Sequence, residues 1–236
     1  MSDDLTAMTG ASGALVLVLS AGGSLCAWER EGSLEREWAL YERLGGTYER
    51  IIVVSDAGAD QAEREREIAA TLRVALVMNE DGTERAAHLA RLGEMVRGAL
   101  GDAPRSVVVK TNQHSAADPA LAIVSGLERS GVDAALVARG GYLWTRFVAH
   151  ELGAGSREFA ECASRERELV RRADVVVGTS RSMLGRSAGS AGRVSVDAVR
   201  RARAWGRVAG VRGVRKPREG AGEACGRGGG DVAFDA

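Results

Sequence analysis

The sequence has no long apolar run and no leader-like start, which argues against a membrane span and a signal peptide. The longest early apolar run, residues 14–19, is far shorter than the roughly 20 residues that a membrane helix needs. It follows the acidic start "MSDD" and not the basic stretch that opens a signal peptide. We therefore expect neither a signal peptide nor a transmembrane segment.

Cysteines and metal-ligand patterns are also scarce. Cys26, Cys162 and Cys225 lie far apart, so they provide neither a disulfide framework nor a spacing such as C-x-x-C. No histidines, cysteines or carboxylates stand at a recognisable ligand spacing, and the chain lacks the P-loop pattern G-x-x-x-x-G-K-[ST]. We expect no metal and no cofactor, and a reducing cytoplasm is the simplest compartment.

The net charge of zero conceals two regions of opposite sign. Residues 185–236 hold 11 basic and 5 acidic side chains and are rich in glycine, arginine and alanine, whereas residues 1–184 hold 21 basic and 27 acidic ones. This change predicts a disordered N-terminus (1–13), one folded domain (14–184) and a disordered tail (185–236). The tail's two aromatics, Trp205 and Phe234, do not interleave with its arginines, so we expect no nucleic-acid binding.

Six near-continuous apolar runs alternate with amphipathic stretches up to residue 184. Runs of this kind suit strands that are buried on both faces of a parallel sheet. The alternation predicts a doubly wound, mostly parallel α/β domain of the Rossmann-like type with right-handed crossovers. The predicted strands are residues 14–19, 50–54, 74–78, 106–110, 134–138 and 174–178.

Two of the intervening stretches give clear helix patterns. In "GSLEREWALYERL" the apolar residues fall on one stripe formed by Leu34, Trp38, Tyr41, Leu40 and Leu44. In "SREFAECASRERELVRR" Ser156 is a suitable N-cap, and arginines in the last turn complement the helix dipole.

In such sheets ligands bind beyond the carboxyl ends of the strands, so the loops that follow strands are the candidate sites. After the first run, Gly22, Gly23 and Ser24 would let backbone amides approach a ligand. The loop is not G-x-G-x-x-G, and we expect the next helix to begin only near Ser33. A tight turn without a ligand is the alternative interpretation.

Polar side chains follow the fourth run, where Asn112, Gln113 and His114 offer amide groups and an imidazole that suit a sugar or another polyol. Alternatively, Asn112 and Gln113 bind neighbouring backbone and His114 is a surface loop residue. His88 and His150 lie on helix-like segments, where we expect structural or solvated roles.

An aromatic cluster follows the fifth run, although aromatics make up only 4% of the chain. Tyr142 and Trp144 could stack on a ring while Arg139 or Arg146 meets an anionic group. Alternatively, the cluster with Phe147 plugs the end of the sheet against a helix.

Four segments together resemble a known family. "LSAGGSLCAWEREGSLEREWALYERL", "VVVKTNQHSAAD", "VARGGYLWTRFVAHELG" and "ERELVRRADVVVGTSRSM" resemble the N-terminal domain of glycosyltransferase family 4, retaining enzymes of the GT-B fold that use nucleotide sugars. The resemblance implies two Rossmann-type domains across a cleft, the N-terminal one holding mainly a hydroxyl acceptor such as a glycan, a glycolipid or a metabolite.

The resemblance also implies roles for the candidate residues. Gly22, Gly23 and Ser24 would face the donor phosphates or the transferred sugar, and His114 would take the proton of the attacking hydroxyl. Asn112, Gln113, Arg139 and Tyr142 would line the acceptor side. A lipid acceptor would bring peripheral contact with the inner face of the membrane, for which the arginine-rich helix 157–172 is a candidate, although its glutamates favour a solvated face.

One departure from the family is large, because only 52 residues follow Leu184 and they carry no donor-domain pattern. We interpret the tail as the product of a frameshifted or truncated gene, so this chain alone would be inactive. A natural basic tail is the competing interpretation. A second function class is a non-catalytic Rossmann-type binding module that pairs with a separate donor-domain protein.

Overall fold

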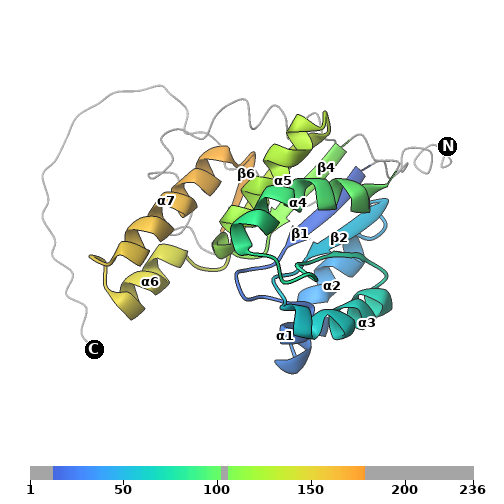
Figure 1. Ribbon diagram of the computed structural model, residues 1–236, viewed down its shortest axis with the longest axis horizontal. Coiled ribbons are helices and arrows are strands. Elements are labelled where there is room, and N and C mark those ends of the chain that lie inside the picture. The colour runs from blue at the N-terminus through green and yellow to red at the C-terminus, as the bar shows by residue number, and fades with distance from the viewer. Residues whose placement is uncertain (1–12, 102–105, 179–236) are drawn as a thin grey trace, which may run out of the picture. The chain divides into compact units, whose positions relative to one another are not determined.

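Six parallel strands form a single sheet in the order β3-β2-β1-β4-β5-β6 (Figure 1). The computed structural model describes residues 13–101 and 106–178. All six predicted strands are present, so the doubly wound, parallel α/β prediction is confirmed. The strands are β1 (Gly13–Val18), β2 (Arg50–Val54), β3 (Ala75–Val77), β4 (Ser106–Thr111), β5 (Asp133–Gly140) and β6 (Val175–Gly178).

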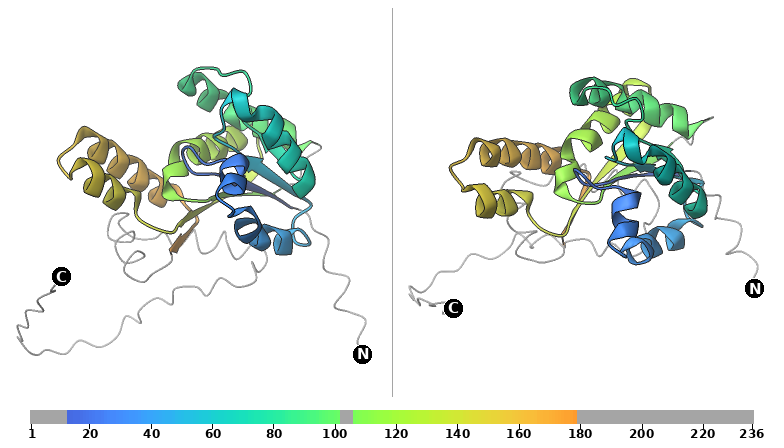
Figure 2. Two further views of the ribbon diagram at one scale, coloured as in Figure 1. Left: turned by 90° about the horizontal axis from the view of Figure 1, so that it is seen from below. Right: turned by 60° about the horizontal axis from the view of Figure 1, so that its bottom comes forward.

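Helices join the strands and cover the two faces of the sheet, the first three helices on one face and later ones on the other. The crossovers before β4 contain α1 (Leu25–Arg30), α2 (Leu34–Leu44), η1 (Ala59–Gln61), α3 (Ala62–Leu72) and α4 (Arg85–Leu100). Those after β4 contain η2 (His114–Ala116), α5 (Ala117–Arg129), α6 (Trp144–Leu152) and α7 (Arg157–Arg172). The views in Figures 1 and 2 place α4, α5 and α7 on one face and α1, α2 and α3 on the other.

Each face of the sheet carries its own core. On the α4, α5 and α7 face, Val16, Val109 and Leu136 are fully buried against helix residues such as Ile123 and Leu169. The opposite face packs its apolar residues against α1, α2 and α3, and these core residues include Leu17, Val53, Trp28, Trp38, Tyr41 and Ile68. The β-branched and aliphatic runs are buried on both faces of β1, as the sequence predicts.

Two glycines explain the close packing of α4 on α5. A Cβ atom built on Gly93 would lie 2.6 Å from the Cα atom of Gly126, and the reverse holds as well. Because the obstructing atoms are backbone atoms, neither helix accepts a side chain there. This contact fixes α5, which follows the candidate residues at the end of β4.

The helix predictions hold with two corrections. Ser156 caps α7 by accepting a hydrogen bond from the Phe159 N–H at 3.1 Å, as expected. On α2, Trp38 and Tyr41 are buried, but Leu40 is 52% exposed, so its place on the apolar stripe was wrong. The helix after the glycine loop also begins earlier than expected.

The predicted boundaries can be compared with the structure only in part. β1 begins at Gly13, one residue inside the segment expected to be a disordered N-terminus. Residues 1–12 and the predicted tail, 185–236, lie outside the described residues, and the last described residue is Gly178. No helix in the described ranges is long and apolar enough to cross a membrane.

Candidate functional site

The candidate loops meet at one edge of the sheet, because parallel strands end on the same side. Hydrogen bonds join neighbouring loops: the Asp56 N–H donates to the carbonyl of Gly23 at 3.0 Å, and the Asn112 N–H donates to the carbonyl of Val18 at 2.8 Å. The loops after β1 and β4 flank the point where the strand order reverses, the usual ligand position in such sheets. We call this edge, after β1, β2, β4 and β5, the carboxyl edge.

The glycine loop leads directly into α1, which corrects the expected start near Ser33. Ser24 caps α1 by accepting a hydrogen bond from the Ala27 N–H at 2.9 Å, and Gly32, with φ +65°, ends the short connection before α2. The sequence pattern missed α1 because six residues show no helical period. Gly22 itself has φ +70°, a conformation that glycine adopts without strain.

Protein groups already accept from the glycine-loop amides. The Gly22 N–H donates to the Asp56 carboxylate at 2.7 Å, and the Gly23 N–H donates to the Ser20 carbonyl at 2.7 Å. Ser24 is buried, and its side chain serves α1. An anion arriving at this loop would therefore compete with Asp56.

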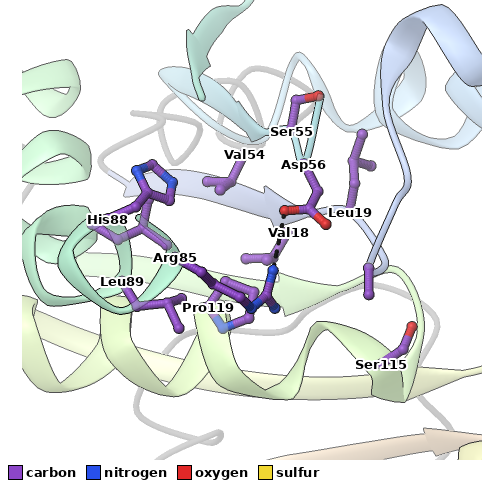
Figure 3. Close-up of a pocket in the computed structure, with 12 residues that line it drawn as sticks. Val18, Leu19, Val54, Ser55, Asp56, Arg85, His88, Leu89, Ser115 and Pro119 are labelled. Carbon is purple, nitrogen blue, oxygen red and sulfur yellow. Dashed lines mark ion pairs between the residues drawn. The ribbon is translucent and has the colours of Figure 1, made fainter. Parts of the chain in front are cut away.

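Asp56 also belongs to a small cavity between the ends of β1 and β2 and the first turns of α4. Figure 3 shows its carboxylate facing Arg85, and the two groups form an ion pair at 3.6 Å. The cavity has a volume of about 20 Å³, room for about one water molecule and too little for a sugar. A larger hollow of about 240 Å³ lies where β3 meets α4, and neither hollow is lined by the site residues predicted from sequence.

His114 lies at the start of η2 and is fully buried, so its interpretation as a surface loop residue was wrong. Its Nδ1 atom lies 2.6 Å from Oε1 of Glu166 on α7. Within the described ranges its Nε2 atom has no hydrogen-bond partner. The buried imidazole is therefore held at one nitrogen only.

Glu166 joins His114 to the start of α6. Its carboxylate also accepts hydrogen bonds from the Trp144 N–H at 3.1 Å, the Thr145 N–H at 3.3 Å and the Thr145 hydroxyl at 2.8 Å. Burial alone would raise the pKa of Glu166, but the hydrogen bonds from His114 and Thr145 outweigh it and keep the pKa below its ordinary value. An ionised Glu166 makes Nδ1 of His114 the donor and directs any proton exchange to Nε2.

Three predicted acceptor residues lie together at the ends of β4 and β5. The Arg139 guanidinium donates through Nη1 to the carbonyl of Asn112 at 2.8 Å and to its Oδ1 at 3.3 Å. Gln113 accepts from the Gly141 N–H at 2.6 Å through its Oε1. The alternative that these amide side chains bind neighbouring backbone thus holds for Gln113, while Asn112 orients a guanidinium.

The aromatic cluster after β5 faces outward. Tyr142 is 47% exposed and Phe147 is 57% exposed, with ring centroids 6.2 Å apart. They do not plug the end of the sheet, so that alternative was wrong for both. Trp144 is the first residue of α6 and is partly buried, and its backbone N–H donates to the Glu166 carboxylate.

Three residues that the sequence analysis overlooked belong to this edge. Asp56 is the second residue after the second strand, so the rule that selected the other loops would also have found it. Glu166 stands among many charged residues on α7, but it shares the buried stripe of Cys162 and Leu169, where a carboxylate is unusual. Lys110, on β4, is the only lysine of the described residues among many arginines.

Metal binding and thiol chemistry gain no support here. In the described ranges, no group of three or more histidine, cysteine or acidic side chains could hold a metal ion. Burial and, to a smaller extent, the neighbouring Glu65 carboxylate together raise the pKa of the Cys26 thiol to about 11. Burial likewise raises the pKa of Cys162 to about 12, so both thiols are poor nucleophiles.

The residues of this chain by themselves account for the fold and for the geometry of the carboxyl edge. Comparisons with models of known families, with curated proteins and with solved structures found no match to this chain.

Proposed function

We propose that this chain provides the acceptor-binding half of a retaining glycosyltransferase that uses a nucleotide sugar. The proposal rests on the resemblance of four segments to family 4 of these enzymes. The observation that carries it furthest is the meeting of three of those segments at one site. His114 and the backbone N–H of Trp144 both bind the carboxylate of Glu166, and these three residues come from three different segments.

In this proposal the two halves of the carboxyl edge have different roles. The glycine loop would face the departing diphosphate, whose charge would replace the Asp56 carboxylate at the Gly22 amide. The Asn112 and Arg139 pair would position the acceptor, and Tyr142 would stack on a sugar ring. Only positioning and removal of one proton are then required of the acceptor side.

His114 would take that proton through Nε2 while Glu166 holds Nδ1. Because the imidazole is fully buried, contact with a substrate hydroxyl requires the residues over it to move apart. Closure of a second domain on this edge would provide that movement. The described residues contain one Rossmann-like unit, so in this proposal the donor-binding domain would come from outside the described residues.

One experiment separates this proposal from a non-catalytic module that pairs with a donor-domain protein. The gene would be sequenced through the codon for Leu184 and about 600 bases beyond, enough for a further domain of roughly 200 residues. If another frame encodes such a domain, the restored chain should transfer sugar from one of a panel of nucleotide sugars. If no other frame encodes one and a neighbouring gene encodes only a donor domain, the enzyme proposal for this chain fails and the binding module that pairs with that protein is favoured.

The residue roles need a second test in the restored enzyme. Asn112→Ala and Tyr142→Ala should each raise the KM for the acceptor about tenfold or more, while the KM for the donor changes little. Leu40→Ala is the matched control, because Leu40 is exposed on α2 away from this edge. Unchanged acceptor kinetics in both variants would remove these two residues from the acceptor site.

A further inference from the structure

On one face of the sheet, β5 and β6 have no described helix packed fully over them. On the face that carries α1, α2 and α3, these helices pack over β1, β2 and β3 (Figure 2), and their core reaches Val108 on β4. On the same face, Val177 on β6 is 36% exposed among the described residues, and Val175 on β6 and Val137 on β5 are only partly buried. This part of the sheet also carries two cationic side chains, Lys110 and Arg139.

Lys110 lies on β4, where its Cα partner on β5 is Val137. Its Nζ atom donates to the hydroxyl of Tyr41 on α2 at 2.7 Å and lies 5.0 Å from the centroid of that ring. No carboxylate of the described residues forms an ion pair with Lys110. Two of the three donors on the ammonium group therefore remain for another acceptor.

Arg139 follows Val137 by two positions on β5, so its side chain emerges on the same face as that of Lys110. Its Nη1 atom binds Asn112, which fixes the guanidinium plane. The other edge of the guanidinium, Nε and Nη2, has no partner among the described residues. The N–H groups of that edge point the same way and can donate to two oxygen atoms of one anion.

The two cations act on each other across the strands. Burial and, to a smaller extent, the charge of Arg139 together lower the pKa of Lys110 to about 8, while Glu37 on α2 opposes the shift. A half-buried cation without a counter-ion is costly, and two of them side by side are more so. A bound oxyanion would offset both penalties and use the unoccupied donors.

We propose that Lys110 and Arg139 form a binding site for an oxyanion, a phosphate or a carboxylate group, with the Tyr41 hydroxyl beside it. Arg139 holds the anion through its free edge, and Lys110 adds a point charge from the neighbouring strand. The identification of this group as part of the sugar acceptor rests on the proposed function. In that case the acceptor is anionic, either phosphorylated or containing a uronic acid.

The test uses the scarcity of lysine, because the whole chain contains only Lys110 and Lys216. Protein labelled with carbon-13 lysine gives two side-chain signals that can be followed by NMR. Inorganic phosphate, glucuronate and neutral glucose would be titrated separately at constant ionic strength. We expect phosphate or glucuronate to shift the Lys110 signal to saturation and to raise the pH at which it titrates, while glucose leaves it unchanged.

Variants assign the effect to this site. Arg139→Gln should weaken anion binding about tenfold or more, and Arg139→Lys, which keeps the charge but loses the fork, should weaken it less. Arg43→Gln, an exposed arginine on α2, should bind as the unaltered chain does. A Lys110 signal that no anion shifts, or binding that Arg139→Gln leaves unchanged, would overturn the proposal.

The choice of anion identifies its source, because saturation by phosphate alone indicates a phosphoryl group and saturation by glucuronate alone a uronic acid. Saturation by both indicates a general oxyanion site, and each of these three results supports the proposal. Anion binding by Lys110 without any sugar transfer by the restored enzyme would leave this site standing and remove the proposed function.

Discussion

The two halves of the carboxyl edge differ in how far their polar groups are satisfied. On the side of β1 and β2, the Gly22 amide has the Asp56 carboxylate, and Asp56 has Arg85. On the side of β4 and β5, Nε2 of His114 and the free edge of Arg139 have no partner in the described ranges. The Gly22 amide of the first half is thus already paired, although Oε2 of the buried Glu65 behind α1 has no partner in the described ranges, whereas the unpaired groups of the second half lie on the predicted site residues themselves.

This difference has a physical meaning, because unpaired buried polar groups lower stability and are rare unless a function requires them. Glu166 shows how the second half tolerates them. It accepts four hydrogen bonds from η2 and α6. One strongly bound carboxylate therefore fixes His114 through Nδ1, although Nε2 has no partner in the described ranges. Ligand recognition is therefore expected on the side of β4 and β5.

Removing Glu166 should give the largest effect on stability. Glu166→Ala leaves His114 Nδ1 and two backbone amides of α6 without their acceptor, so the free energy of unfolding should fall by about 3–4 kcal/mol. Urea unfolding measures the change. Glu168→Ala, an exposed glutamate paired with Arg171 on the same helix, should cost less than about 1 kcal/mol. Similar losses in both variants would mean that Glu166 does not organise this edge.

Removing Asp56 should give a smaller effect, because its carboxylate is partly exposed. Asp56→Ala loses the bond from the Gly22 N–H and the ion pair with Arg85, which should lower the free energy of unfolding by about 1–2 kcal/mol. Asp56→Asn keeps one acceptor oxygen and should lose about half as much. A loss as large as that of Glu166→Ala would erase the contrast between the two halves.

Lys110 should make stability depend on pH. Its pKa is lowered from 10.5 to about 8 in the folded protein, so the unfolded chain binds more protons between these values. Stability contributed by this group is therefore gained as pH rises from about 8 to 10.5. Tyr41 and Glu37 from α2 and Arg139 from β5 are the charged or titratable groups that face it.

The matched variant for this prediction is Lys110→Met. At pH 7 it should unfold with a free energy about 1 kcal/mol higher than the unaltered chain, because a poorly paired cation is removed. The difference should shrink as pH rises past about 8. Burial raises the pKa of Tyr41, the partner of Lys110, well above this range, so the difference in unfolding free energy reports on the lysine. A constant difference across this range would show that Lys110 keeps an ordinary pKa.

The strands could be predicted from the sequence because each is a short run of β-branched and aliphatic residues. The Gly93 and Gly126 contact could not, since it depends on how two distant helices meet. The same limit applies to the site. The rule that ligands follow strands found His114, but its burial depends on Glu166, 52 residues away in the chain. Local patterns identify candidates, and only the fold shows which are paired.

The smallest expected effects concern the two buried cysteines, which report on the two halves separately. Cys26 lies in α1 beside the glycine loop, and Cys162 lies one turn before Glu166 on α7. In a Cys225→Ser background neither thiol should react readily with a neutral thiol reagent, because burial raises the pKa of both. Any reaction then requires local opening of the fold.

Glu166→Gln provides the comparison for these thiols. The amide keeps one acceptor oxygen but loses the charge that holds His114 and Thr145, so Cys162 should react several-fold faster while Cys26 keeps its rate. Because the Glu166 charge also helps to raise the pKa of Cys162, rates are measured over a range of pH to separate that effect from local opening. Reaction rates followed by mass spectrometry measure both thiols in one sample. Equal acceleration of the two would mean that the edge opens as one unit, whereas acceleration of Cys162 alone confines the opening to the half that contains the proposed acceptor residues.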